Sequence, residues 1–243
     1  MLSKAHLVFL FFFFCLCNLN AQISFAPYQI IPTGSFPQVV AVGDLNNDGL
    51  NDIVLGTGIY FDPSNDCKLF VFYQNSSGTL NSAVKYPYPY SSPTILGIAI
   101  ADVNNDFLND IVFCFNDSIG IYFQNASHTF NPLVTYFTGN YADALKVGDL
   151  NNDGLLDIVV VHQNEIYIKV FYQTSTGFIT TSYAKPYSHY DDLKIGDVNN
   201  DQLSDVVFVS HDFPSAMYIF TQNVSGNLNP IQTYPFLGGG FGF

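Results

Sequence analysis

The chain has 243 residues, of which 48% are hydrophobic and only 11% are charged. This length and composition exclude a disordered protein and allow one large domain, or two small ones, with a buried core. The formal net charge is −13, and lysine supplies every basic side chain. Because a phosphate-binding surface needs clustered lysine and arginine, we expect neither a nucleic-acid partner nor binding to an anionic membrane surface.

The N-terminal segment carries one lysine and then an apolar, phenylalanine-rich run from Leu7 to Cys17. A positive charge followed by about eleven apolar residues predicts a secretory signal peptide. Such a run is too short to cross a bilayer, which takes about 20 residues. We therefore predict a signal peptide over residues 1–21, a secreted, extracellular mature chain and no membrane span. A buried strand or an N-terminal anchor is the alternative interpretation.

Four acidic segments repeat along the rest of the chain. Their first aspartates are separated by 58, 47 and 48 residues, and a recurrence of this kind indicates a repeat architecture. The segments are GDLNNDGLNDIV at 43–54, ADVNNDFLNDIV at 101–112, GDLNNDGLLDIV at 148–159 and GDVNNDQLSDVV at 196–207.

Each repeat shows the same order of short apolar stretches. One stretch enters the acidic loop, as at 39–42, and an unbroken apolar run follows it, as at 158–161. A third stretch ends near Tyr-Gln-Asn, as at 69–75, and a more alternating fourth one closes the repeat, as at 79–86. Such runs, divided by Gly, Asn and Ser turns, predict antiparallel strands. We predict an all-β fold: a β-propeller or partial propeller of four four-stranded antiparallel blades of about 48 residues.

The acidic segments resemble the FG-GAP, or VCBS, repeats, over roughly residues 24–235. Those repeats form the β-propeller of integrin α-subunit heads and of many secreted proteins. The family's Phe-Gly and Gly-Ala-Pro signatures are not clear here, so the VCBS-like variety fits better. Seven blades are usual in integrin-type members, whereas four are expected here, and a truncated array, a partial propeller and a four-bladed ring all stay open. The resemblance implies propeller repeats over residues 22–243, with loops at 44–52, 102–110, 149–157 and 197–205.

The residue types at alternate positions of the first loop favour calcium. Asp44, Asn46 and Asp48 occupy positions 1, 3 and 5, Leu50 at position 7 offers its carbonyl, and Asp52 at position 9 can close the site. Calcium takes six to eight oxygen ligands, whereas zinc needs recurring His or Cys and magnesium prefers strict octahedral geometry. An Asx-rich hairpin turn is the simpler alternative. Three mutually repelling carboxylates in each of four loops favour a cation instead.

By resemblance to the family, the same five positions bind calcium in every repeat. The matching residues are Asp102, Asn104, Asp106, Leu108 and Asp110 in the second loop, Asp149, Asn151, Asp153, Leu155 and Asp157 in the third, and Asp197, Asn199, Asp201, Leu203 and Asp205 in the fourth. The residue at position 6 is glycine in two of the loops and a larger residue in the other two. Gly49 and Gly154 suit a left-handed backbone, whereas Phe107 and Gln202 would cost roughly 1–2 kcal/mol there. We therefore predict weaker calcium affinity in the second and fourth loops.

The residues of the repeats favour a binding module over an enzyme. The histidines occupy unmatched positions, and no nucleophile elbow or phosphate-binding glycine loop occurs, so we expect no enzyme. The leading hypothesis is a secreted binding or adhesion module with structural calcium, whose ligand is an unidentified protein or carbohydrate. The alternative is a sugar-binding lectin or a propeller-type hydrolase or lyase.

Three smaller features leave alternatives open. Sequons predict a glycoprotein if the chain follows a eukaryotic secretory route, and they lie at Asn75, Asn116, Asn125 and Asn223. Cys67 and Cys114 could pair, or Cys114 could be a buried free thiol. The aromatic stretch 86–90 is either an exposed binding loop or a rigid connection between blades.

Overall fold

The chain divides into two compact units, Met1–Pro32 and Thr33–Phe243. The computed structural model describes residues 28, 30–33, 36–58, 68–89, 94–162, 165–186, 192–210 and 215–236. In the first unit the described residues form no regular element, and the predicted signal peptide lies outside the described residues. No helix in the described part of the chain is long and apolar enough to cross a membrane.

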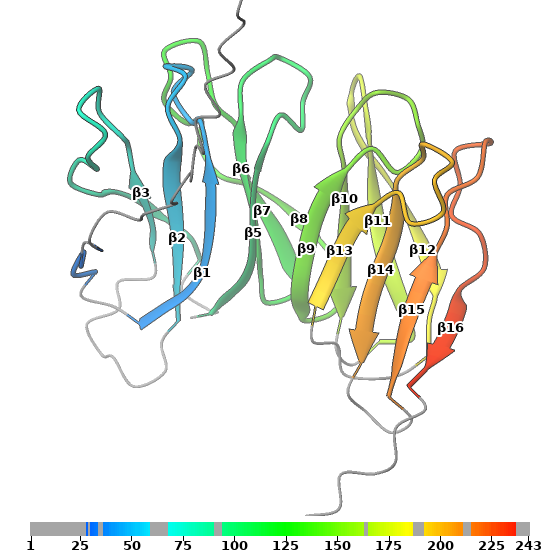
Figure 1. Ribbon diagram of the computed structural model, residues 1–243. Coiled ribbons are helices and arrows are strands. Elements are labelled where there is room, and N and C mark those ends of the chain that lie inside the picture. Colours follow the sequence, from blue (N-terminus) through cyan, green and yellow to red (C-terminus); the bar gives the residue numbers. More distant parts are fainter. Residues whose placement is uncertain are drawn as a thin grey trace, which may run out of the picture. The chain divides into compact units, whose positions relative to one another are not determined.

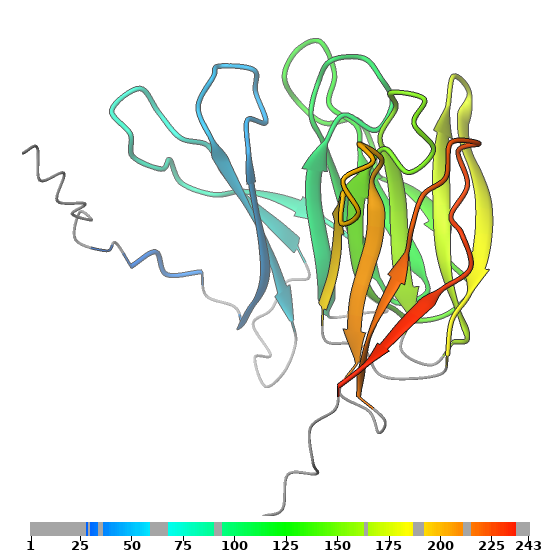
Figure 2. The same cartoon turned by 45° about the vertical axis from the view of Figure 1, so that its right-hand side comes forward.

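The second unit contains four four-stranded antiparallel sheets among its described residues (Figure 1, Figure 2). The first sheet is β1 (Phe36–Gly43), β2 (Asp52–Gly58), β3 (Lys68–Phe72) and β4 (Val84–Pro87). The second is β5 (Ile95–Ala101), β6 (Asp110–Phe115), β7 (Ser118–Tyr122) and β8 (Val134–Phe137). The third is β9 (Ala142–Gly148), β10 (Asp157–His162), β11 (Tyr167–Thr174) and β12 (Gly177–Ala184). The fourth is β13 (Asp192–Gly196), β14 (Asp205–Ser210), β15 (Ala216–Phe220) and β16 (Gln232–Pro235).

Within every sheet the strands lie side by side in chain order, so each repeat is one meander. This arrangement confirms the predicted all-β fold with four four-stranded blades. The second strands β6 and β10 are buried along their whole length. Their unbroken apolar sequences are explained by cover on both faces, since successive side chains of a strand point to opposite sides.

Three apolar clusters lie between neighbouring sheets. Successive side chains along a strand point to opposite faces of the sheet and therefore belong to different clusters. Phe113 belongs to the cluster between the first and second sheets, whereas the adjacent Val112 belongs to the cluster between the second and third. In the same way Ile158 packs toward the second sheet and Val159 toward the fourth. The first strands β1, β5, β9 and β13 are neighbours in that order. The core therefore consists of repeated joints between sheet faces.

The aromatic stretch after β4 is a packed connection between blades. Tyr88 is buried, its ring centroid lies 6.0 Å from that of Phe113, and its hydroxyl donates to the carbonyl of Thr57 at 3.2 Å. The interpretation of residues 86–89 as a rigid connection is therefore the one that fits, and Tyr90 lies outside the described residues. Cys114 is a buried free thiol, and burial raises its pKa to about 12. Cys67 also lies outside the described residues.

Three of the sequon asparagines shape the turn between the third and fourth strands of their sheets. The Asn75 carboxamide oxygen accepts the N–H groups of Ser77 and Thr79 at 3.0 and 3.3 Å. Asn125 and Asn223 accept the corresponding N–H groups in their own turns. Their recurrence thus has a structural cause, because Asn stabilises turns in this way. Glycosylation at these sites stays a prediction.

Candidate metal-binding loops

Each acidic loop joins the first and second strands of its sheet. In the first sheet the loop runs between Gly43 and Asp52, which are paired across β1 and β2. The other three loops are bounded by the equivalent pairs, which are Ala101 with Asp110, Gly148 with Asp157 and Gly196 with Asp205. The last strand pair before the loop therefore contains the position 9 aspartate, and residues at positions 1–8 form the turn.

The position 1 aspartate organises the turn by accepting backbone N–H groups. One oxygen of Asp102 accepts from Asn104, Asn105 and Asp106 at 3.2, 2.6 and 3.2 Å, and the other accepts from Phe107 at 2.8 Å. The first, third and fourth loops repeat this arrangement, apart from the bond from position 4 in the first. In the fourth loop these bonds, chiefly that from Gln202, lower the pKa of Asp197. The carboxylate of Asp197 is thus held in its charged form.

Positions 3 and 5 lie in direct contact with each other. The Asn46 carboxamide donates to Asp48 Oδ2 at 3.0 Å and accepts the Asp48 N–H at 3.1 Å. Asp48 Oδ1 accepts the N–H of Leu50 at position 7, at 2.8 Å. The same three bonds occur in the other loops at 2.8–3.1 Å. Four different sequences therefore adopt one loop geometry.

Two positions in each loop have a left-handed backbone. The predicted one is position 6, where φ is +81° at Gly49 and +83° at Gly154, but also +66° at Phe107 and +70° at Gln202. The predicted strain at Phe107 and Gln202 is therefore present. The other is position 4, where φ lies between +59° and +65° at Asn47, Asn105, Asn152 and Asn200. Asn tolerates this conformation better than most residues, which explains its recurrence there.

The position 9 aspartates are fully buried, unlike those at positions 1 and 5 of the same loops. Asp110 Oδ2 accepts the N–H of Val103 at 3.1 Å, and its Oδ1 accepts the N–H of Gln124 after the third strand at 2.9 Å. The other three loops have the same two bonds at 2.8–3.1 Å. This carboxylate therefore ties the acidic loop to the end of the third strand.

Burial and like charge oppose ionisation of the position 9 aspartates in the first three loops. Burial, followed by repulsion from Asp106 and Asp102, raises the pKa of Asp110 to about 7 against the two backbone N–H groups that lower it. The same causes raise the pKa of Asp157 to about 6, and that of Asp52 in the same direction. The negative charge of the loop is therefore only partly compensated by the backbone.

The atoms in each loop that could ligate a metal ion are oxygen atoms of carboxylates, a carboxamide and a backbone carbonyl. In the described part of the chain, no three His, Cys, Asp or Glu side chains gather as a metal site. A bound cation would therefore need the Asn and carbonyl oxygens together with the carboxylates. Hard oxygen donors of mixed type suit calcium, so the donor set fits the predicted ion in its chemistry.

Neighbouring loops are linked across the joint between their sheets. Asn109, at position 8 of the second loop, donates from Nδ2 to the carbonyl of Asp44 at 2.8 Å. The Gln124 carboxamide donates to the carbonyls of Leu45 and Asn109. The second sheet therefore supports the backbone at positions 1 and 2 of the first loop, which is thus part of the packing between the first and second sheets.

A family model described as an FG-GAP-like repeat matches residues 102–160, which include the second and third acidic loops in full. Human integrin alpha-6 is 38% identical to this chain over 81 residues, which is 32% of the chain and 7% of integrin alpha-6. The chain thus matches only a small part of that relative's length. These findings confirm the resemblance that the acidic segments indicated.

A solved structure extends the likeness beyond the matched FG-GAP-like repeat. It comes from a study of the recognition of non-reducing terminal N-acetylglucosamine by a lectin of Agrocybe aegerita. The TM-score is 0.56 at 17% identity, and the match covers 79% of this chain and half of the lectin chain. At this identity the likeness shows the fold, and it supports the propeller-like arrangement of the four sheets.

Two recurring residue types carry structural roles in the four repeats that the sequence pattern did not reveal. The position 4 asparagines supply the second left-handed residue of each loop. Glutamines at or just beyond the ends of the third strands donate their backbone N–H groups to the position 9 aspartates, and they are Gln74, Gln124, Gln173 and Gln222. Both types occur in all four repeats, and this recurrence is the signal that could have found them.

Proposed function

We propose that this chain is a secreted, calcium-binding FG-GAP-type module that binds a partner and uses calcium as a structural ion. The observation that carries the calcium proposal is the shared geometry of the four loops. In each, the position 1 carboxylate accepts the backbone N–H groups of positions 3, 5 and 6. The position 3 carboxamide donates to the position 5 carboxylate, and the position 9 carboxylate is buried. Sequence differences at positions 2, 6 and 8 leave this geometry unchanged.

Calcium would be held by the side-chain oxygens at positions 1, 3, 5 and 9 and the backbone carbonyl at position 7. The ion supplies positive charge that offsets the mutual repulsion of three carboxylates. The protein contributes the loop, which is fixed by the N–H groups donated to position 1 and position 9. Because Asp110 also accepts the N–H of Gln124, order in the second loop stabilises the end of the third strand. Structural calcium would therefore stiffen whole sheets.

Partner binding and secretion are supported by independent observations. Integrin alpha-6 matches 32% of this chain, and the N-terminal apolar run predicts a signal peptide. The acidic residues that could do acid–base chemistry recur in four equivalent loops, whereas an active site is usually single. We therefore favour a binding or adhesion module over an enzyme.

A carbohydrate ligand is the second candidate, and the likeness to the lectin favours it. Fold likeness at this identity does not transfer a binding site. Binding of the mature chain to an array of glycans that includes terminal N-acetylglucosamine tests this candidate. A protein ligand is the expected alternative if no glycan is retained.

Isothermal titration of the mature chain with calcium tests the proposed ion. The double variant Asp149→Asn with Asp153→Asn removes two carboxylates from one loop that has glycine at position 6. We expect calcium uptake to fall by one site per chain. The matched control is Asp117→Asn, because Asp117 is an exposed aspartate in the turn between β6 and β7. No calcium uptake by the parent chain, or equal uptake by both variants, would refute the proposal.

A further inference from the structure

Every joint between two neighbouring sheets pairs the same two kinds of face. Positions are counted here from the first aspartate of each loop. The residue four places before that aspartate points back to the preceding sheet, as shown by Ile98, Leu145 and Leu193, which are all buried in the joints. The residue at position 2 points forward to the following sheet, and Leu45, Val103 and Leu150 are buried there. Each sheet thus has a backward face and a forward face.

A glycine socket fits the two faces together in two of the three joints. A Cβ atom added to Gly43 would lie 2.9 Å from Ile100 Cγ2, and one added to Gly148 would lie 3.0 Å from Ile195 Cγ2. The glycine stands one place before the first aspartate of its sheet, and the isoleucine stands two places before that of the next sheet. The forward glycine therefore leaves room for the backward aliphatic side chain.

The backward face of the first sheet has no described sheet against it. Val40 and Val42 occupy the places of Ile98 and Ile100, but they are 56% and 62% exposed. Ile53 and Leu55 on β2 are half-buried, whereas the equivalent side chains on the other second strands are fully buried. This first-sheet face (Val40, Val42, Ile53 and Leu55) is apolar and accessible.

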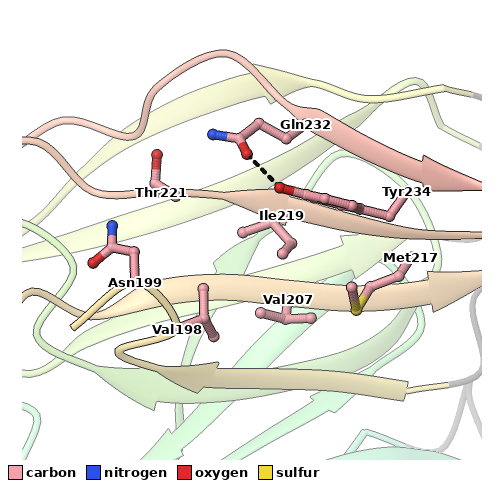
Figure 3. Close-up of a pocket in the computed structure, with 8 residues that line it drawn as sticks. All are labelled: Val198, Asn199, Val207, Met217, Ile219, Thr221, Gln232 and Tyr234. Carbon is pink, nitrogen blue, oxygen red and sulfur yellow. Dashed lines mark hydrogen bonds between the residues drawn. The ribbon is translucent and has the colours of Figure 1, made fainter. Parts of the chain in front are cut away.

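The forward face of the fourth sheet is open in the same sense. A Cβ atom added to Gly196 would meet nothing within 4 Å, and Val198 at position 2 is 51% exposed. A groove of about 420 Å³ lies on this fourth-sheet face, and Figure 3 shows the residues that line it. The groove is lined by Val198, Asn199, Val207, Met217, Ile219, Thr221, Gln232 and Tyr234, none of which is charged.

Tyrosines at equivalent places on the last strands indicate which kind of surface should cover the fourth-sheet face. On the last strands of the first three sheets, a tyrosine packs against an aromatic ring of the following sheet. The pairs are Tyr86 with Tyr122 at 5.4 Å, Tyr136 with Phe171 at 6.5 Å and Tyr183 with Phe220 at 6.0 Å. Tyr234 stands at the equivalent place on β16 and is exposed, and its hydroxyl donates to Gln232 Oε1 at 2.9 Å.

We propose that the first-sheet face of one copy of this chain docks on the fourth-sheet face of a second copy. The occupant is complementary, because Val42 is the backward aliphatic side chain that the open socket at Gly196 would receive. The docked contact repeats a joint that the chain already makes three times. Two copies related by a two-fold axis satisfy both open faces at once and close a ring of eight sheets, four from each copy. Eight blades lie within the range of closed propellers.

Light scattering coupled to gel filtration tests the proposal on the mature chain. We expect twice the mass of one chain. Val42→Lys and Gly196→Asp place charges on opposite sides of the proposed contact, and both positions have open space in the single chain. Each variant alone is expected to be a monomer. A mixture of the two is expected to regain the dimer, since the lysine then faces the aspartate at one contact and Val42 meets Gly196 at the other.

A charge placed outside both faces serves as the control. Ile179→Lys changes an aliphatic side chain that is 64% exposed on β12, away from both faces, and should leave the dimer intact. Recovery on mixing excludes misfolding as the cause of dissociation, and far-ultraviolet circular dichroism of each variant checks its strand content. A monomeric parent chain would overturn the proposal. So would a dimer that persists in both face variants, or failure of the mixture to regain the dimer.

Discussion

The left-handed residue at position 6 provides a direct test of the loop geometry. Phe107 has φ of +66°, and its side chain is 84% exposed. Its N–H donates to Asp102 Oδ2 at 2.8 Å, and a glycine would keep that bond. Phe107→Gly therefore removes backbone strain while giving up little apolar burial.

The change in the free energy of unfolding expected for Phe107→Gly combines two opposing contributions. A left-handed non-glycine residue costs roughly 1–2 kcal/mol. Glycine raises the conformational entropy of the unfolded chain, which costs about 0.5–1 kcal/mol. We expect Phe107→Gly to increase the free energy of unfolding by about 0.5–1 kcal/mol, within the range seen for compatible backbone substitutions.

Urea unfolding in the presence of a chelator measures this change without a contribution from calcium. The midpoint should rise in Phe107→Gly at an unchanged m value. The matched variant is Gly49→Ala, because an added Cβ there meets nothing within 4 Å and only the φ of +81° opposes it. That variant should lose about 1 kcal/mol. An unchanged or lower midpoint in Phe107→Gly, with no loss in Gly49→Ala, would refute the strain argument.

Three further predictions concern calcium affinity, a joint and a buried histidine. In calorimetric titration, Phe107→Gly should tighten calcium binding at the second loop, by up to about tenfold if 1.4 kcal/mol of strain is relieved; equal or weaker binding would contradict this. Gln124→Ala removes the donor to the buried Leu45 carbonyl and should lower the free energy of unfolding by about 1–3 kcal/mol. The equivalent Gln74, which is half-buried on the first sheet, should cost less than about 0.5 kcal/mol when changed to alanine, and equal losses in urea would count against the role of Gln124. Burial lowers the pKa of His162 from 6.5 to about 4, so the folded chain keeps it neutral while the unfolded chain takes up a proton. Stability is therefore fully present above pH 6.5 and falls as the pH drops toward 4. Urea midpoints of His162→Gln should show a shallower fall in that window, and identical pH slopes would contradict the assignment.

The sequence predicted the strands and loop boundaries well because both follow from local patterns. Alternating oxygen-bearing residues marked the turns, and the unbroken apolar runs marked strands covered on both faces, as at β10. The left-handed backbone at Gly49 was predicted from the steric freedom of glycine and is confirmed. Asn47 at position 4 was not assigned this conformation, although the same repeat contained the signal.

Features that depend on contacts between distant residues could not be read from one sequence. Asp110 is buried and accepts bonds from Val103 and from Gln124, which lies fourteen residues later in the chain. The state of Cys114 depends on packing between the second and third sheets. The open faces at Val42 and Gly196 became recognisable only when the equivalent positions of the other sheets proved to be buried.

Thermal unfolding of the mature chain with calcium or with a chelator tests whether the four loops hold structural calcium. A ligand that binds only the folded chain raises its melting temperature as its concentration increases. We expect a higher melting temperature in calcium than in chelator, and a much smaller increase with magnesium at the same concentration. A melting temperature that is the same in calcium and in chelator would contradict the assignment of the four loops as structural calcium sites.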